Sequence, residues 1–221
     1  PIGPNFSDLE SRSVLTKKES SDASKITKEK ILDATMQTIA KEKIAGTRMH
    51  LIAEAAGTSQ SNLHYHFPTK NDLLLAVLDR LQRYFSEKRS ESLDLEHQTF
   101  AENLHALFAE KKDDILHHKE VDCVQFDYLL QSTVDPTIRK KMQHTFSIWR
   151  QDIARVLREN VAFAKAHPAL LAVLPNLIIS LLIGGSMQYL LDSGVDGMNL
   201  DAYFQQAEDL ILRLCDEKPE E

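Results

Sequence analysis

The sequence predicts an all-α protein in which a small three-helix domain precedes a larger helical body. Only seven Gly and seven Pro occur in 221 residues, and no segment shows the alternation of apolar and polar residues, bounded by hairpin turns, that strands require. Apolar residues instead recur every three or four positions along most of the chain, as on one face of an α-helix. This spacing predicts about nine helices in total.

The first two helices are expected to follow an irregular N-terminus. Residues 1–23 are polar, mixed in charge and without a helical period, which predicts a flexible tail. A helical period begins at about Ser24 and continues to Lys43, where the first helix is expected. Thr47 is expected to cap a second helix. Gly57 is expected to end it, because glycine readily takes the left-handed conformation found at helix ends.

A third, short helix is expected next, capped by Thr58 or Ser59 and broken by Pro68. Thr69 and Asp72 then have the spacing of a capping box, in which a hydroxyl and a carboxylate bond each other's backbone amides. Apolar residues at helical spacing follow, so a long fourth helix is predicted.

The rest of the chain is predicted to fold into further helices. The clearest follows Pro136, a residue favoured in the first turn of a helix. Asp192 to Gly197 echoes a calcium loop, but glycine stands at its third position and tyrosine at its twelfth, so a connecting loop is expected. The helices are expected near residues 97–117, 120–133, 136–165, 175–192 and 200–216.

The net charge of −7 is divided unevenly along the chain. Residues 24–71 carry seven Lys and Arg against four Asp and Glu, a net +3, whereas residues 72–221 carry 16 against 25, a net −9. A basic segment on an acidic body suits a small nucleic-acid-binding domain, because the body repels phosphates and so restrains non-specific binding.

The segment from Ile52 to Leu63 has the features of a helix-turn-helix. Ala53 and Ala56 are small enough for two helices to cross closely, Gly57 allows the tight turn, and Leu63 can anchor the second helix to the core. The other side chains of the second helix are polar, and none is acidic. Gln and Asn can pair with adenine, while Ser, His and Tyr can bond phosphates. The motif therefore predicts a helix that reads bases in the major groove of DNA.

Residues flanking the motif are candidates for phosphate contacts. Arg48 and Lys70 add positive charge on either side, and Thr47 and Ser59 lie at predicted helix starts, where free backbone amides favour a phosphate. A role as simple helix caps would explain the two hydroxyl residues equally.

From about Ile31 to Leu78 the sequence resembles the TetR family of repressors. The resemblance rests on Ile-Leu-x-Ala, Gly-Thr, Ile-Ala-x-x-Ala-Gly, Asn-Leu-x-x-His-Phe-x-x-Lys and the Leu-Leu that follows; the rest of the chain matches only in helix count and length. It implies that Tyr65 and His66 face the sugar-phosphate edge, although ordinary packing would also account for either residue.

The resemblance also assigns roles on the recognition helix. Gln60, Ser61 and Asn62 would face the bases, and Lys70 would hold a phosphate. The family usually has Tyr where this chain has His64, so the contact at this position and its pH dependence stay open. The predicted DNA-binding residues are Thr47, Arg48, Ser59, Gln60, Ser61, Asn62, His64, Tyr65, His66 and Lys70.

The body is expected to form a homodimer. A head of this size reads only a few base pairs, so specific binding requires two copies on a palindromic operator. The helices near 175–192 and 200–216 can supply the interface, and Gly184 and Gly185 would allow close helix approach. In the family, the last two helices usually form a four-helix dimer interface.

The resemblance further implies that a small-molecule effector binds within the body and releases the operator. Such an effector must bind two arrangements of the dimer with different affinity. Aromatic and apolar residues of the predicted body helices are the candidates for the pocket, although ordinary core packing would explain each one. They are His105, Phe108, Phe126, Met142, Phe146, Trp149 and Tyr189. The predicted organisation is thus a tail (1–23), a DNA-binding domain (24–71) and an effector-binding and dimerisation domain (72–221).

Other chemistries find little support. His64 and His66 are turned by about 200° from each other on a helix, so they cannot converge on one metal ion. No phosphate-binding loop, dinucleotide fingerprint or zinc-protease motif occurs. Neither an enzyme nor a cofactor or metal is therefore predicted. Cys123 and Cys215 lie far apart and no secretion signal opens the chain, so the cytoplasm is the expected location.

One stretch suggests a membrane span. Ala166 to Leu191 has no charged residue and is long enough to cross a bilayer. Pro175, Gln188 and the lack of Lys or Arg beside Asp192 weigh against a span, and a helix buried between subunits explains the same composition. A transcriptional repressor without membrane contact is thus expected. The alternatives are an architectural DNA-binding protein without effector, and a helical interaction or membrane-anchored protein whose resemblance is accidental.

Overall fold

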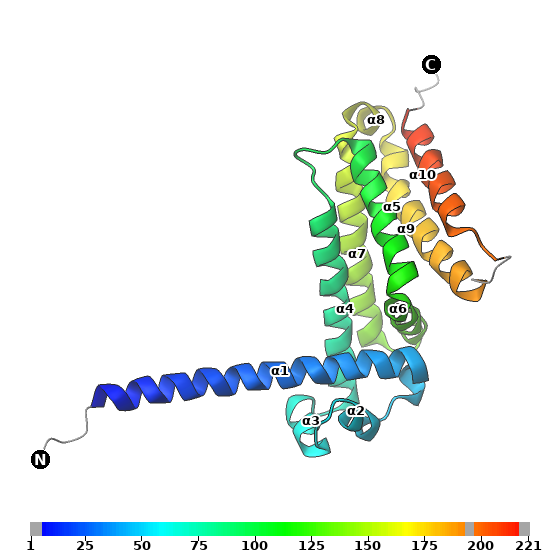
Figure 1. Ribbon diagram of the computed structural model, residues 1–221. Helices are drawn as coiled ribbons and strands as arrows, with labels where there is room; N and C mark the ends of the chain where they lie inside the picture. Colours follow the sequence, from blue (N-terminus) through cyan, green and yellow to red (C-terminus); the bar gives the residue numbers. More distant parts are fainter. Residues whose placement is uncertain (1–5, 193–196, 217–221) are drawn as a thin grey trace, which may run out of the picture. The chain divides into compact units, whose positions relative to one another are not determined.

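The computed structural model describes residues 6–192 and 197–216, with side chains from residue 22 onward, and this part of the chain is all-helical (Figure 1). It divides into two compact units, residues 1–77 and 78–221, and α4 contributes residues to both. The helices are α1 (Phe6–Gly46), α2 (Met49–Ala55), α3 (Gln60–His66), α4 (Lys70–Ser92), α5 (Phe100–His117), α6 (Lys119–Gln131), α7 (Pro136–Glu159), α8 (Val161–Ala166), α9 (Pro168–Leu191) and α10 (Leu200–Asp216).

The first unit contains a small core that holds α1, α2 and α3 together. Ile31, Ile39, Ile52 and Leu63 are each 0% exposed, as the helical spacing of the apolar residues predicts. The ammonium of Lys28 lies 5.6 Å from the centre of the Phe67 ring and covers one edge of this core.

The first helix is longer than predicted. α1 begins at Phe6, where the sequence suggested an irregular tail over residues 1–23; residues 1–5 of that tail lie outside the described part. Between Phe6 and Ala45 the chain has neither Gly nor Pro, and residues such as Glu, Lys, Leu and Ala favour helix even without an apolar face. Lys43, with φ 62° and ψ 166°, interrupts the helix near its end.

The second unit is a bundle whose long helices are α5, α7, α9 and α10 together with the C-terminal half of α4 (Figure 1). α7 packs on α9, and α10 packs on both α5 and α9. The core between them is apolar. Its most buried members, each at most 2% exposed, are Leu104, Leu107, Phe108, Ile115, Ile153, Val156, Leu157, Phe163, Leu174, Ile178, Leu182 and Ile211.

Two predicted boundaries in the second unit were wrong. The helix expected over 136–165 ends at Glu159, because Asn160 leaves the helical conformation and its side chain accepts a bond from Phe163 N at 3.1 Å, which caps a separate α8. α9 begins at Pro168 and keeps Pro175 inside the helix, whereas the sequence suggested Pro175 as the start. Pro168 suits the start of α9, because the first residues of a helix have no intrahelical partner for their N–H, which proline lacks.

α9 is apolar on almost every side. By length and composition it could cross a membrane, and 39% of its most apolar window is buried inside the described structure; core helices of globular proteins have the same character. Its buried face includes Leu174, Ile178 and Leu182. A Cβ placed on Gly185 would lie 2.6 Å from Tyr203 Cε1 of α10, whereas one on Gly184 would meet nothing within 4 Å. Within the chain, therefore, Gly185 allows α10 to approach α9 closely and Gly184 does not contact it.

The connection between α9 and α10 is described only in part. Residues 193–196 of the loop expected from its calcium-like spacing lie outside the described residues. The two ends of the connection are bonded to each other, since the amide of Met198 donates to the carbonyl of Asp192 at 2.9 Å.

Candidate DNA-binding interface

The turn between α2 and α3 is closed by backbone bonds. Gly57 has φ +64°, its amide donates to Glu54 O at 3.0 Å, and the amide of Thr58 donates to Ala53 O at 2.9 Å. These two bonds form a Schellman motif, in which a left-handed residue after the helix lets the last carbonyls find donors. The prediction that Gly57 ends this helix is confirmed.

The start of α3 is capped by a side chain. Ser59 Oγ accepts a bond from Asn62 N at 3.1 Å, and Thr58 Oγ1 accepts one from the side-chain amide of Asn62 at 2.8 Å. Of the two predicted caps, Ser59 is the helix cap and Thr58 supports it. Leu63 is 0% exposed and fixes the opposite face of α3 in the core, as predicted.

The outward face of α3 is polar. Gln60, Ser61 and His64 are exposed, and Tyr65 is 79% exposed. Asn62 is half-buried, and because its amide nitrogen is bonded to Thr58, its carbonyl oxygen is the group left to accept a bond from a partner. These side chains carry donors and acceptors at the surface, as base edges require.

The last turn of α3 holds the two histidines. His64 Nδ1 lies 3.1 Å from the carbonyl of Pro68, so this ring is bonded to the turn that precedes α4. The rings of Tyr65 and His66 meet edge to face with centres 5.2 Å apart. His66 is half-buried beside the exposed Tyr65. At the position where the family usually has Tyr, the chain thus has a local contact that orients the imidazole.

Two cations meet at the junction of α1 and α2. Lys70 Nζ donates to Ile44 O at 2.7 Å and to Thr47 O at 2.8 Å, and an Arg48 guanidinium nitrogen donates to Thr47 O at 3.2 Å and to Ala45 O at 2.7 Å. Partial burial and the nearby Arg48 charge lower the pKa of Lys70. Two positive groups on one carbonyl create a local excess of positive charge at the junction of α1 and α2.

Thr47 differs from its predicted role. It was expected to cap α2 and to meet a phosphate, but it is 0% exposed, and its hydroxyl and amide both donate to Lys43 O, at 2.8 and 3.1 Å. The residue at the cap position is Arg48, without a capping side-chain bond. Thr47 instead closes the end of α1, where its amide makes the regular helical bond to Lys43 O and its hydroxyl adds a second bond to the same carbonyl.

The start of α4 confirms the predicted capping box. Thr69 N donates to Asp72 Oδ2 at 3.0 Å, and Asp72 N donates to Thr69 Oγ1 at 3.1 Å. These reciprocal bonds fix the first residue of α4, and the ammonium of Lys70 is thereby held over the α1 to α2 junction.

Three candidate effector residues make contacts between helices of the second unit. His105 is exposed, and its Nδ1 lies 3.1 Å from Glu208 Oε2. Phe108 packs edge-on against Phe204 of α10 at 5.9 Å. Tyr189 packs against the main apolar core. These three predicted lining residues serve helix packing in this arrangement.

The remaining candidates lie on α6 and α7. Met142 and Phe146 line one groove of about 260 Å³, Trp149 lines a separate small cavity of about 10 Å³, and Phe126 is half-buried. The sequence analysis missed the charged residues that share the cavity with Trp149. The sequence did contain a signal for them, because the spacing of apolar residues in α5 places Lys111 and nearby acidic residues on the buried face of the helix.

Metal-binding residues do not gather in the described part of the chain, where no three His, Cys, Asp or Glu side chains stand close enough to hold an ion. Cys123 and Cys215 are both free thiols, and burial raises the pKa of Cys215 to about 11. Such a thiol is inert at neutral pH.

A tight glycine turn, a capped second helix with a polar outward face and flanking cations define a helix-turn-helix protein. Residues 31–77 match the family model described as bacterial regulatory proteins, tetR family. Over 54 residues the chain is 44% identical to the HTH-type transcriptional regulator RutR of Escherichia coli, which covers 24% of this chain and 26% of that regulator. The chain thus matches about a quarter of the length of this curated relative.

Solved structures resemble the chain over most of its length. A transcriptional regulator from Saccharomonospora viridis in complex with choline is 25% identical, with a TM-score of 0.69, over 88% of this chain and 98% of that one. A TetR transcriptional regulator from Chloroflexus aurantiacus is 18% identical, with a TM-score of 0.75, over 87% of this chain and 97% of that one. Residues 31–77 thus match the segment typical of tetR-family bacterial regulatory proteins, and the fold of the chain resembles that of solved transcriptional regulators.

Proposed function

We propose that the protein is a cytoplasmic transcriptional repressor that binds a palindromic operator as a homodimer and releases it when a small molecule binds the second unit. The observation that carries the proposal is the outward face of α3, where Gln60, Ser61 and His64 are exposed, in the same unit as the cation pair that Arg48 and Lys70 form at the junction of α1 and α2. Bases are read by such side chains, and phosphates are held by such cations.

The head is already ordered for this task. The bonds at Gly57, Thr58 and Ser59, all made within the motif, hold α3 at a fixed angle to α2. Lys70 and Arg48 would contact the phosphates next to the groove that α3 enters, with Tyr65 and His66 along the sugar-phosphate edge. Thr47, being buried, would act by shaping this junction.

A dimer would use α9 and α10. Gly184 has open space around it, and exposed apolar side chains at steps of three, four and seven residues continue its line along α9. Leu210 of α10 is 53% exposed. A stripe of this kind in contact with water is unfavourable and is typical of a helix interface. The exposed residues of the α9 stripe are Val173 at 49%, Leu177 at 46%, Met187 at 50% and Leu191 at 85%.

An effector is supported by the relative from Saccharomonospora viridis, which was solved with choline. Its similarity extends through the second unit, at 98% coverage of that chain. A ligand that binds the second unit can act on the first through α4, which is one continuous helix from Lys70 to Ser92.

Selection of bound fragments from random and genomic DNA by the purified full chain tests the proposal, and recovery of a palindrome is the expected result. Gln60→Ala should then reduce discrimination at one base position by about 1–3 kcal/mol. Lys70→Ala should weaken binding to all DNA sequences alike. It should also reduce the slope of log affinity against log salt concentration by about one. Lys165→Ala on α8 removes the same charge from an exposed site in the second unit and should change neither quantity. Unchanged binding in both head variants would contradict the assignment of α3 to the groove.

Light scattering tests the dimer. Leu210→Glu should yield monomers and abolish operator binding, because a charge cannot be buried unpaired between helices. Leu130→Glu places the same charge at a 69% exposed position on α6 and should leave the protein dimeric. A dimer that persists with Leu210→Glu would place the interface elsewhere.

A further inference from the structure

Two grooves of the second unit meet at Arg150 of α7, which lines both. The first groove, of about 260 Å³, lies between the end of α6 and the first half of α7. The second, of about 410 Å³, lies between the second half of α7 and the start of α9. Because they share Arg150, the two grooves form one continuous surface along α7, here termed the α7 surface.

The residues that α7 contributes to this surface form two neighbouring rows with steps of four residues. One row runs from Arg139 to Gln151, and the other runs from Met142 to Arg158. Rows of this kind are the ridges of a helix surface, and a second helix packs its own ridge between two of them at a crossing angle of roughly −50°. Together the rows extend about 28 Å along the helix axis, which is too long for one small molecule. Their spacing and length fit a helix.

The floor of the α7 surface is apolar. Met142 and Pro175 are buried, and Leu129, Phe146 and Leu171 are half-buried. Each of these residues lines one of the two grooves. A helix bound here would take the half-buried side chains out of water, and burial of apolar area favours binding.

The rim of the α7 surface is basic. Three arginines line the grooves, and no Asp or Glu of the described residues does so. Arg150 and Arg158 form no ion pair with any residue that the structure describes. The guanidinium of Arg139 donates to the carbonyls of Ser132 and Thr133, at 2.8 and 2.6 Å, which leaves its charge without a counter-charge.

α7 also differs in charge from the rest of its unit. It has six Lys and Arg against Asp152 and Glu159, a net +4, and α9 has no charged residue, whereas residues 72–221 together carry −9. Carboxylates match arginine well, because a guanidinium can bond both of their oxygens. The complement of the α7 surface is therefore a helix with an apolar stripe and acidic side chains beside it.

The helices of a second copy do not supply this complement. α10 is acidic and amphipathic, but its apolar residues Phe204 and Ile211 are buried in its own unit, so α10 of a second copy cannot turn them into a groove. The exposed apolar stripe of α9 that is proposed for the dimer lines neither groove. The α7 surface and the dimer surface are thus separate.

We propose that the α7 surface is a docking site for an acidic amphipathic helix of a partner protein. The apolar stripe of the partner helix packs between the two rows of α7, and its Asp or Glu side chains pair with Arg150 and Arg158. This interaction needs neither DNA nor an effector. It therefore goes beyond the proposed function, and failure of either proposal leaves the other standing.

Fluorescence anisotropy of a labelled peptide tests the docking site. The probe is a synthetic helix of about 20 residues, the length that the two rows require, with leucine at steps of three and four residues and glutamate on both sides of that stripe. We expect saturable binding to the unaltered full chain. A peptide of the same composition in scrambled order, and one with lysine in place of each glutamate, should each bind about tenfold more weakly or worse.

The control peptides separate the two contributions. Equal binding of the scrambled peptide would mean that charge attraction alone holds the probe, and equal binding of the lysine peptide would mean that apolar contact alone does. Either result, or no saturable binding of the acidic peptide, would overturn the proposal.

A new charge in each groove shows whether one helix spans both. Gln143 lines the first groove and Gln151 the second, and both are exposed. Gln143→Glu and Gln151→Glu should each weaken the acidic peptide about tenfold, because the added carboxylate repels it. Gln98→Glu makes the same change at an exposed position before α5 and should leave the affinity unaltered. An effect in one groove alone would contradict a helix that lies across both.

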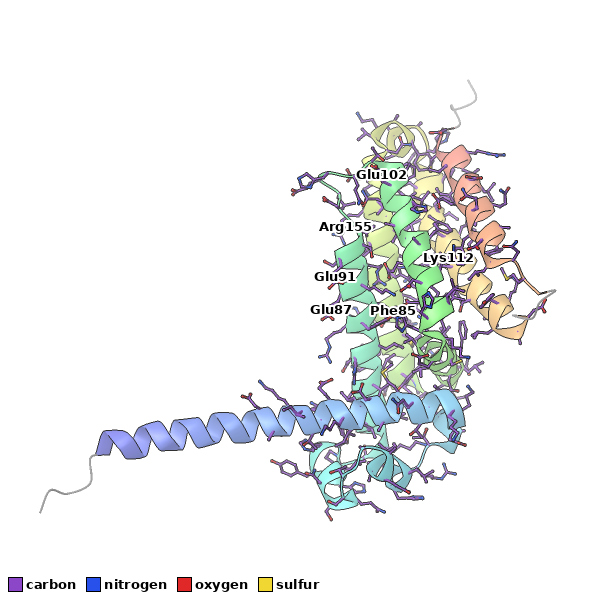
Figure 2. All side chains as sticks on the ribbon, in the orientation of Figure 1. Phe85, Glu87, Glu91, Glu102, Lys112 and Arg155 are labelled. Carbon is purple, nitrogen blue, oxygen red and sulfur yellow. The ribbon has the colours of Figure 1, made fainter. Side chains whose placement is uncertain are left out.

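An arginine pair on α7 provides the second matched test. Arg150→Gln removes the charge that both grooves share and should weaken the acidic peptide about tenfold. Arg155, labelled in Figure 2, lines a different recess, with Ser86 and Ser90 of α4, so Arg155→Gln should leave the affinity unaltered. Equal effects of the two variants would contradict the site. Circular dichroism checks the fold of each variant. Light scattering checks the occupant, since a change of oligomeric state in Gln143→Glu would assign the surface to a second copy and overturn the proposal.

Discussion

The two units differ in how far apart in the chain their polar contacts reach. In the reading motif of the first unit, Asn62 bonds to residues three and four positions away. In the second unit, Arg89 bonds to Asp152 and Ser186 bonds to Asp122 across 63 and 64 residues. Local bonds can be recognised in a sequence, and long-range bonds depend on how helices pack. The first unit therefore depends on backbone geometry, and the second depends on paired charges inside a helical bundle.

The largest expected effect comes from the buried triad of the second unit. Asp122, 0% exposed, pairs with the ammonium of Lys111 and accepts a bond from Ser186. Asp122→Asn leaves a buried Lys111 without its counter-charge, and we expect a loss of about 3–5 kcal/mol in the free energy of unfolding. Denaturant titration measures it.

An exposed ion pair whose lysine also lies on α5 provides the control. Lys112, labelled in Figure 2, pairs with Asp201 of α10, and their side chains are 36% and 76% exposed. Asp201→Asn should cost less than about 1 kcal/mol, because water screens the pair. Similar losses in the two variants would mean that paired charges do not distinguish the interior of this unit from its surface.

Glu110, which lines the small cavity beside Trp149, predicts a pH dependence of stability. Burial raises the pKa of Glu110 to about 7 against its ordinary 4.5, with opposing influences from Arg89, Lys88 and Lys111 and a reinforcing one from Asp114. Between these values the folded protein keeps a proton that the unfolded chain has released. Stability should therefore fall as pH rises from about 4.5 through 7, by on the order of 1–3 kcal/mol.

Glu110→Gln removes this titration. Thermal unfolding of the variant should be flatter than that of the unaltered protein over the same pH range. A variant with the same slope would show that other groups cause the pH dependence.

Neighbouring glycines of α9 should respond differently to one methyl group. Gly185→Ala places Cβ 2.6 Å from a Tyr203 ring carbon, so α9 and α10 must shift, and we expect a loss of about 1–3 kcal/mol. At Gly184 nothing lies within 4 Å of the new Cβ. Gly184→Ala should leave the stability of each protomer unchanged or slightly raise it, as measured by unfolding under dilute conditions.

The smallest expected effect is in the first unit. Gly57→Ala adds a Cβ that meets nothing within 4 Å, but at φ +64° the backbone is unfavourable for any L side chain. The cost should be about 1–2 kcal/mol and should come from conformation alone. Gly57→Asn, which tolerates this region better, should recover part of the loss. No recovery would mean that contacts, and not backbone conformation, select glycine here.

Much of the first unit could be predicted from the sequence. Gly57, Ser59 and the box of Thr69 with Asp72 act through bonds to near neighbours, so residue type and spacing sufficed. Thr47 was misassigned because its position at a helix start resembles a cap. Its hydroxyl bonds back to Lys43 O at the end of α1 instead, and residue type alone does not distinguish this use of a threonine from a cap.

The second unit was predicted only as a set of helices. Glu110 and Asp114 were passed over because charged residues on an amphipathic helix ordinarily face water. Their burial depends on Arg89 and Lys88, which belong to a different helix, α4. The helical spacing of apolar residues does not show that these charges will meet. The aromatic candidates for a pocket do not share one cavity for the same reason. The spacing of apolar residues shows which face of a helix is buried, but not which residues that face contacts.

The closed turn at Gly57 and Thr58 also has a kinetic consequence. Because its amides and the cap of α3 are satisfied before DNA arrives, no segment of the motif has to fold during encounter. Association should then depend on diffusion steered by Arg48 and Lys70, and slow as salt is added. Discrimination between DNA sequences would then lie in the dissociation rate of the complex and not in its association rate.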